Sequence, residues 1–146
     1  MNDWWEMLFG LLIGGVCIYL FRQFERSLEI FLYAFFLFII SMLAIAVSYF
    51  QIGKFFYIET VYPVLFILLA MWGYKISAWW LVLGYFLHAI ADVAALFLFQ
   101  STPFPSGFIP FCVSLNLLFA SYLYYWAAAE TRHQRELARR LARQQV

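Results

Sequence analysis

The chain has 146 residues, of which 66% are hydrophobic and only 12% are charged, and its formal net charge is +1. A soluble domain of this length needs a polar surface that such a composition does not supply. The aromatic content of 23% and the mean hydropathy of +0.85 instead predict one integral membrane domain whose ring residues lie at the headgroup level.

Five apolar segments follow one another along the chain, separated by short polar breaks. A helix that crosses the roughly 30 Å hydrocarbon core needs about 20 apolar residues, and lipid offers no partner for an unpaired backbone group. The segments therefore predict an all-α integral membrane bundle of five transmembrane helices. Their expected ranges are Trp4–Phe21, Leu28–Phe50, Phe55–Tyr74, Ala78–Gln100 and Gly107–Ala129.

The first segment has the features of a retained helix rather than of a cleaved leader. Asp3 and Glu6 stand where a signal peptide carries Lys or Arg, and no small-residue cleavage site follows the apolar run. Within the segment, Gly10 and Gly14 have the small-xxx-small spacing that lets helices approach closely. We expect these two glycines to form a packing face inside the bundle.

Two local signals predict where the next helices begin. Ser27 is a suitable cap for the second helix, because its hydroxyl can accept a bond from a free backbone N–H group. If the third helix begins near Glu59 and Thr60, Pro63 falls in its first turn, where proline is tolerated.

The basic residues fix the expected orientation. Five spans place the two termini on opposite sides, and eight of the nine basic residues then fall on one side, with Lys54 alone on the other. Basic residues near span ends favour the cytoplasmic face, so the N-terminus is expected outside and the C-terminus inside. The eight are Arg22, Arg26, Lys75, Arg132, Arg135, Arg139, Arg140 and Arg143.

The last residues predict a helical extension outside the membrane. We divide the chain into a transmembrane domain, residues 1–129, and a basic cytoplasmic tail, residues 130–146. Each basic residue near a surface of anionic headgroups contributes about 1 kcal/mol, so the tail is expected to bind such lipids. Nucleic acid is not an expected partner, since the net charge of the whole chain is only +1.

Polar side chains from three segments lie at similar depths. At 1.5 Å per residue, Asp92 lies about 12 Å and His88 about 18 Å from the outer end of the fourth segment. Ser114 and Asn116 lie about 10 and 14 Å into the fifth segment, and Ser41 lies about 14 Å into the second. We therefore predict one polar layer in the outer half of the bilayer.

His88 and Asp92 are the candidate catalytic residues, as a proton-handling pair. Gly84, His88 and Asp92 are spaced four residues apart, and we expect this stripe to face Cys112, Asn116 and Ala120 of the fifth segment. A central aspartate costs about 2.5 to 3.5 kcal/mol on membrane-insertion scales, which favours a functional role over helix register alone. The candidate ligand-binding residues are Ser41, Tyr62, Gly84, Ser114 and Asn116.

Several cofactor chemistries lack the residues that they need. One membrane histidine is too few for bis-histidine haem ligation, and no phosphate-binding glycine loop is present. His88, Asp92 and Cys112 would give zinc only a distorted ligand set, and the spans contain no lysine for a retinal Schiff base. We predict no metal and no cofactor.

Residues of the last two segments resemble a pattern in small, uncharacterised multi-pass bacterial membrane proteins. The resemblance implies a bacterial inner-membrane location and no assigned activity. The sequence departs from the pattern at Asn116, where Asp is preferred, and this departure argues further against a metal site. The matching residues are Gly84, Tyr85, His88, Asp92, Pro110, Cys112, Ala120 and Tyr122.

Three functions remain open at this stage, and the sequence does not decide whether the chain is an enzyme. The first is a buried polar site that binds or processes a lipidic or small apolar ligand. The second is a non-catalytic accessory or assembly subunit, bound to another membrane protein or to copies of itself. The third is proton or ion conduction by an oligomer.

Overall fold

The computed structural model describes the backbone of residues 4–51, 56–98 and 107–144, and the side chains of residues 4–43, 61, 63–94 and 107–143. Every regular element in these ranges is an α-helix, as the apolar segments predicted. The five helices are α1 (Trp4–Phe21), α2 (Arg26–Gln51), α3 (Phe56–Lys75), α4 (Trp79–Leu98) and α5 (Phe108–Gln144).

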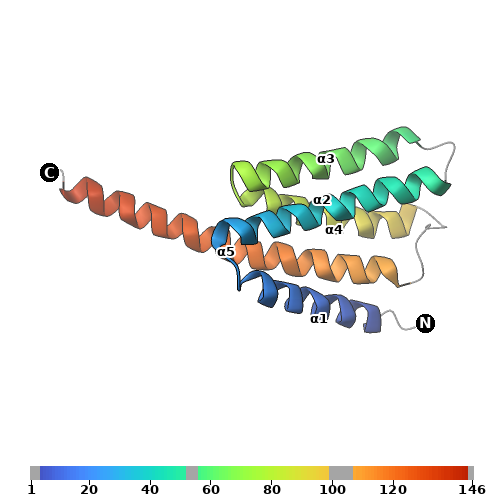
Figure 1. Ribbon diagram of the computed structural model, residues 1–146, viewed down its shortest axis with the longest axis horizontal. Helices are drawn as coiled ribbons and strands as arrows, with labels where there is room; N and C mark the ends of the chain where they lie inside the picture. Colours follow the sequence, from blue (N-terminus) through green and yellow to red (C-terminus); the bar gives the residue numbers. More distant parts are fainter. Residues whose placement is uncertain (1–3, 52–55, 99–106, 145–146) are drawn as a thin grey trace.

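The helices run alongside one another in a bundle (Figure 1). α5 packs against both α1 and α4, while α3 packs against α2 and α4. At one end of the bundle lie the turn between α1 and α2, the turn between α3 and α4, and the projecting C-terminal part of α5 (Figure 1). We call this the arginine-rich end, because Arg22, Arg26, Lys75 and the tail arginines all lie there.

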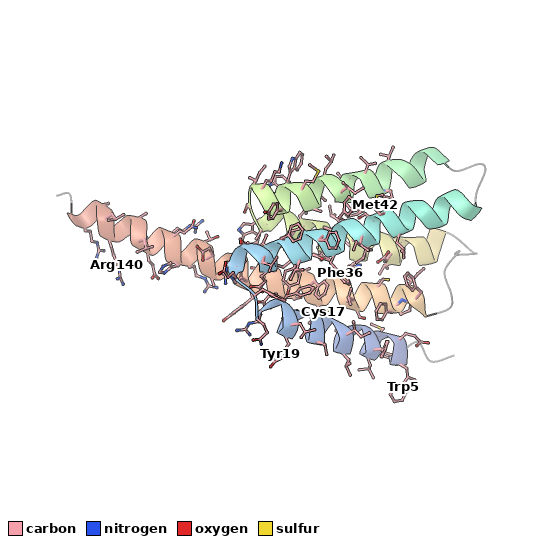
Figure 2. The ribbon with its side chains drawn as sticks, in the orientation of Figure 1. Trp5, Cys17, Tyr19, Phe36, Met42 and Arg140 are labelled. Carbon is pink, nitrogen blue, oxygen red and sulfur yellow. The ribbon has the colours of Figure 1, made fainter. Side chains whose placement is uncertain are left out.

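Three of the helices are long and apolar enough to cross a membrane, namely α1, α2 and α5. The other two are shorter apolar helices over the residues whose side chains are described, Pro63–Lys75 and Trp79–Ala94. Large side chains such as Trp5, Tyr19 and Met42 stand exposed on the bundle surface, where they can contact lipid (Figure 2). These features suggest a membrane protein with several spans.

Aromatic rings fill the centre of the bundle. Phe119 of α5 is fully buried and makes edge-to-face contacts with Tyr33, Phe36 and Tyr85, at centroid distances of 5.3, 5.6 and 5.3 Å. The Tyr85 hydroxyl donates a 2.7 Å hydrogen bond to the Tyr33 carbonyl oxygen. α2, α4 and α5 are therefore held by shape-matched rings, which is how membrane helices associate when lipid removes the hydrophobic driving force.

The predicted glycine face of α1 is confirmed. A Cβ atom at Gly10 would lie 2.5 Å from the Phe111 carbonyl oxygen and would also collide with the Ser114 hydroxyl. At Gly14 it would lie 2.8 Å from Leu118 Cδ2. Both glycines are buried, so their missing side chains allow α1 to approach the backbone of α5 closely.

The predicted cap of α2 was wrong, and so was the placement of Pro63 in the first turn of α3. α2 begins at Arg26, so Ser27 lies inside the helix, and the Glu29 N–H group donates to the Glu25 carbonyl oxygen at 2.9 Å. α3 begins at Phe56, so Pro63 is an interior residue, and it is fully buried. Membrane helices tolerate such a proline because neighbouring helices and local backbone adjustments compensate for the missing hydrogen bond.

Candidate functional site

Three polar side chains from α4 and α5 meet near the middle of α4. The His88 ring nitrogen Nδ1 lies 3.2 Å from Asp92 Oδ2, as the four-residue spacing predicted. Asn116 of α5 donates from Nδ2 to the same Asp92 oxygen at 3.1 Å, and this Nδ2 atom lies 3.3 Å from His88 Nδ1. We call these three residues the polar triad.

The polar triad is shielded to different degrees. Asn116 has no exposed surface, and the His88 side chain is 5% exposed, whereas 19% of the Asp92 side chain is exposed. The His88 ring also packs on the ring of Phe66 from α3, with a centroid distance of 4.8 Å. Packing and hydrogen bonds thus orient the imidazole, while part of the Asp92 side chain lies at the bundle surface.

This geometry allows one proton to occupy either of two atoms. In one arrangement, His88 Nδ1 carries the proton and donates to an ionised Asp92, which also accepts from Asn116. In the other, Asp92 Oδ2 carries the proton and donates to Nδ1. The 3.2 Å separation of the two atoms is a hydrogen-bonding distance in both arrangements. The chemistry that the polar triad can supply is therefore proton donation and acceptance.

The two serines of the predicted polar layer donate hydrogen bonds to backbone carbonyl groups of their own helices. Ser41 is fully buried and donates to the Leu37 carbonyl oxygen at 2.8 Å. Ser114 donates to the Phe111 carbonyl oxygen at 2.9 Å, and its hydroxyl lies against Gly10 of α1. The structure therefore brings together three of the five residues of that layer.

Gly84 lies on a different face from the one predicted. A Cβ atom there would lie 2.7 Å from Leu37 Cδ2 and 3.4 Å from Leu69 Cβ, so this glycine accommodates α2 and α3 rather than α5. Gly84 and Asp92 are eight residues apart, and such residues are rotated by about 80° around an α-helix. The glycine therefore faces other neighbours than the aspartate. Tyr62 lies in α3, outside the residues whose side chains are described.

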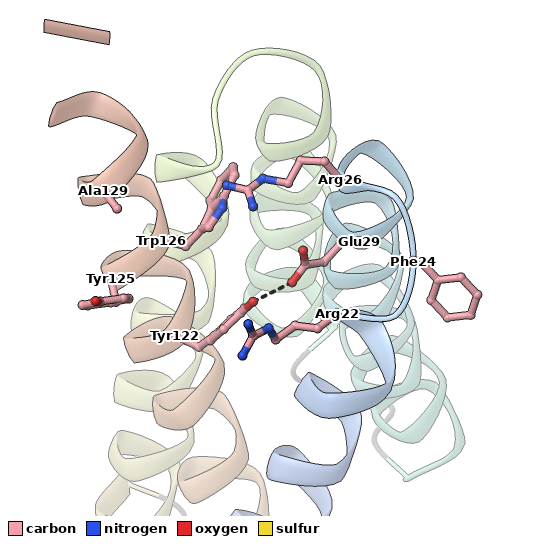
Figure 3. Close-up of a pocket in the computed structure, with 8 residues that line it drawn as sticks. All are labelled: Arg22, Phe24, Arg26, Glu29, Tyr122, Tyr125, Trp126 and Ala129. Carbon is pink, nitrogen blue, oxygen red and sulfur yellow. Dashed lines mark hydrogen bonds between the residues drawn. The ribbon is translucent and has the colours of Figure 1, made fainter. Parts of the chain in front are cut away.

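A second polar cluster, which the sequence reasoning missed, lies at the arginine-rich end. Tyr122 of α5 donates a 2.7 Å hydrogen bond to Glu29 Oε1 of α2, and this glutamate is only 8% exposed (Figure 3). The bond spans a cavity of about 390 Å³, which we call the arginine cavity. It is lined by Arg22, Phe24, Arg26, Glu29, Tyr122, Tyr125, Trp126 and Ala129.

The sequence offers a separate local explanation for each of the two bonded residues. Glu29 is an acidic residue in the first turn of a predicted membrane helix, where the helix dipole alone accounts for it. Tyr122 is 93 residues away, and a tyrosine near a span end is ordinary for the headgroup level. Each residue had a sufficient local explanation, so their pairing could not be predicted.

A further cavity of about 520 Å³ opens on the surface of α4 and α5. Neither this cavity nor the arginine cavity is lined by a residue of the polar triad. Among the side chains that the structure describes, no three His, Cys, Asp or Glu residues gather as a metal site would require. The second cavity is lined by Trp79, Val82, Leu83, Phe86, Ala120, Ser121 and Tyr124.

Comparison with protein families, curated proteins and solved structures finds no match for this chain. The resemblance to small bacterial membrane proteins therefore stays an expectation. What can be concluded about function depends on the geometry of the two polar clusters.

Proposed function

We propose that this chain is a five-pass protein of a bacterial inner membrane, with its N-terminus outside and its C-terminus in the cytoplasm. Three helices of sufficient length and two shorter apolar helices support the number of spans. The gathering of Arg22, Arg26, Lys75 and the tail at one end supports the orientation, because basic residues favour the cytoplasmic side.

Within that membrane, the polar triad is the proposed centre of a site that binds or processes a lipidic or small apolar ligand. The single observation that carries this proposal is the contact of Asn116 with both His88 and Asp92. Ionisable residues in a membrane span are costly, and they usually serve proton transfer or ligand binding. Asp92 has the most exposed side chain of the triad and is the residue that a ligand would reach.

The experiment compares wild-type protein with Asp92→Asn and His88→Ala after purification in a mild detergent. Small molecules that remain bound are extracted and identified by mass spectrometry, and the unfolding midpoint of each protein is measured alongside. We expect a molecule that is retained by the wild type and lost from both variants, while both variants stay folded and show a cooperative unfolding transition.

Ser114→Ala is the matched control, because this buried hydroxyl lies on the same helix as Asn116 but faces α1. It should retain the molecule. If all four proteins carry the same molecules, the ligand proposal is wrong. If His88→Ala and Asp92→Asn both unfold, the polar triad has a structural role instead.

A second candidate function is that of an accessory subunit of a larger membrane complex. It is favoured by the projection of α5 beyond the bundle, where Leu137 and Leu141 are exposed on one side of the helix (Figure 1). An amphipathic helix of this kind can dock on a partner through its apolar face. A purified protein that is monomeric in mild detergent, with no co-purifying partner, would argue against this function.

A further inference from the structure

The arginine cavity has the composition of a site for a phosphate group. Arg22, in the turn between α1 and α2, and Arg26, the first residue of α2, both extend toward α5 (Figure 3). A guanidinium group presents its N–H donors in a fixed planar fork, which matches the oxygens of a phosphate. The lining carries two positive charges and one negative charge, that of Glu29, so its formal sum is +1.

The contacts of Arg26 orient its guanidinium and leave its donors accessible. Its Cζ atom lies 3.7 Å from the centroid of a Trp126 ring, a cation–π contact that holds the group at the cavity. The Arg26 side chain is about half exposed, so a ligand can reach its N–H donors. The nearby Glu130 carboxylate is 3.9 Å away and both side chains are about half exposed, so it competes only weakly.

The one buried acid of the cavity is already engaged. Glu29 accepts the hydrogen bond of the Tyr122 hydroxyl, which fixes the tyrosine ring as a wall of the cavity. The carboxylate therefore positions this wall, while the two guanidinium groups remain available for an anion.

The aromatic residues around the cavity favour a lipid headgroup, rather than a free ion, as the source of the phosphate. Trp126 and Tyr125 line it at the end of the bundle, and tryptophan and tyrosine prefer the headgroup level of a bilayer. Phe24 and Tyr125 stand exposed at the cavity and offer apolar surface beside the guanidinium groups. A volume of about 390 Å³ is within the usual range of small-ligand pockets.

We propose that the arginine cavity binds the phosphate group of a phospholipid headgroup, with Arg22 and Arg26 as its ligands. Glu29 and Tyr122 position the wall of the site. The proposal depends on the chain being in a membrane, but not on the polar triad having a function.

The test is lipid binding by the full-length protein in detergent, followed by native mass spectrometry. The probe is dioleoyl phosphatidylglycerol, and dioleoylglycerol, which has the same acyl chains without phosphate, is the comparison lipid. We expect saturable binding of the first and no saturable binding of the second. Equal binding of the two lipids would overturn the proposal.

Removing both guanidinium groups in the double variant Arg22→Gln, Arg26→Gln should weaken binding by about 30-fold. This figure follows from the usual contribution of two basic residues near a lipid surface. The control variant Lys75→Gln removes a positive charge at the same end of the bundle from outside the cavity lining and should change binding by less than about 3-fold. An equal loss in both would show diffuse attraction to charge and would overturn the cavity as the site.

Two further measurements complete the experiment. If the double variant does not fold, Arg22→Gln alone is used, with an expected weakening of about 5-fold, since the contact of Arg26 with Trp126 then remains. Inorganic phosphate is added at matched ionic strength and should not displace the lipid. Displacement by inorganic phosphate would show a site for the free ion and would contradict the assignment to a phospholipid.

Discussion

The polar triad and the arginine cavity bind helices together in different ways. The triad is small and mostly buried, and joins α4 to α5 through one carboxylate that accepts from an amide and contacts an imidazole. The arginine cavity is open, and joins α2 to α5 through a charged hydrogen bond with guanidinium groups at its side. One site is suited to holding a proton, the other to holding an anion.

The difference shows how depth sets the cost of a charge. In the middle of a membrane span, an unpaired polar group has no water to compensate it, and in the triad the Asn116 amide is directed to the Asp92 carboxylate. At the headgroup level water and lipid phosphates are present, and long arginine side chains can extend to reach them. A carboxylate therefore contacts an amide and an imidazole in the triad, and accepts a hydrogen bond from a tyrosine in the arginine cavity.

The largest effect that we predict is a loss of stability from a substitution at the contact between α1 and α5. Gly10→Ala should destabilise the protein by about 2 kcal/mol, because the added Cβ atom meets the Phe111 carbonyl oxygen and the Ser114 hydroxyl. α1 leads directly into Arg22 and Phe24, so this change should disturb the arginine cavity and leave the triad intact. Unfolding in a detergent titration measures it, with Gly15→Ala as the control, since nothing lies within 4 Å of a Cβ there.

The second prediction concerns the triad itself. Asn116→Ala removes the amide that donates to Asp92, and we expect a loss of about 1.5 kcal/mol in the free energy of unfolding. The double-mutant cycle with Asp92→Ala measures the coupling of the two residues, which should be about 1 kcal/mol. Additive effects would contradict the hydrogen bond that the structure places there.

The third prediction is the corresponding change in the arginine cavity. Tyr122→Phe deletes the hydroxyl that donates to Glu29 and should cost about 1 kcal/mol, less than Asn116→Ala because water can replace the donor. Tyr125→Phe serves as the control, as this side chain is 72% exposed, and its stability should stay at the wild-type value. Equal stabilities of the two variants in chemical denaturation would argue against the Glu29 bond.

The smallest predicted effect is that of the exposed ion pair. Glu130→Gln removes the partner of Arg26, but both side chains are about half exposed and 3.9 Å apart. We expect the unfolding free energy to change by less than about 0.5 kcal/mol. A larger loss would mean that the projecting part of α5 is fixed to the bundle more firmly than this contact explains.

Much of the fold could be predicted because it depends on short-range patterns. Apolar runs of span length gave five helices whose bounds lie near those observed, and the spacing of Gly10 and Gly14 gave a packing face. The contact of His88 with Asp92 follows from the repeat of a single helix. Such features need no knowledge of how neighbouring helices are rotated.

The contacts that could not be predicted depend on how neighbouring helices are rotated about their axes. Ser114 faces α1 and Gly84 faces α2 and α3, although their depth in the membrane was compatible with the triad. The pair of Glu29 and Tyr122 requires the first turn of one helix to meet another helix near the opposite end of the chain. Side-chain packing among five helices decides these directions, and no single segment contains that information. The division of the chain at residue 129 also stays a prediction, since α5 continues as one helix to Gln144.

The most direct test of the proposed proton site is the reaction of the protein with dicyclohexylcarbodiimide, an apolar reagent that attacks protonated carboxyl groups from the membrane phase. Peptide mass spectrometry locates the adduct. We predict modification at Asp92, whose Oδ2 atom lies 3.2 Å from His88 Nδ1, and much less at Glu29, which shares its cavity with two guanidinium groups. An unmodified Asp92, or stronger modification of Glu29, would contradict a proton-handling role for the polar triad.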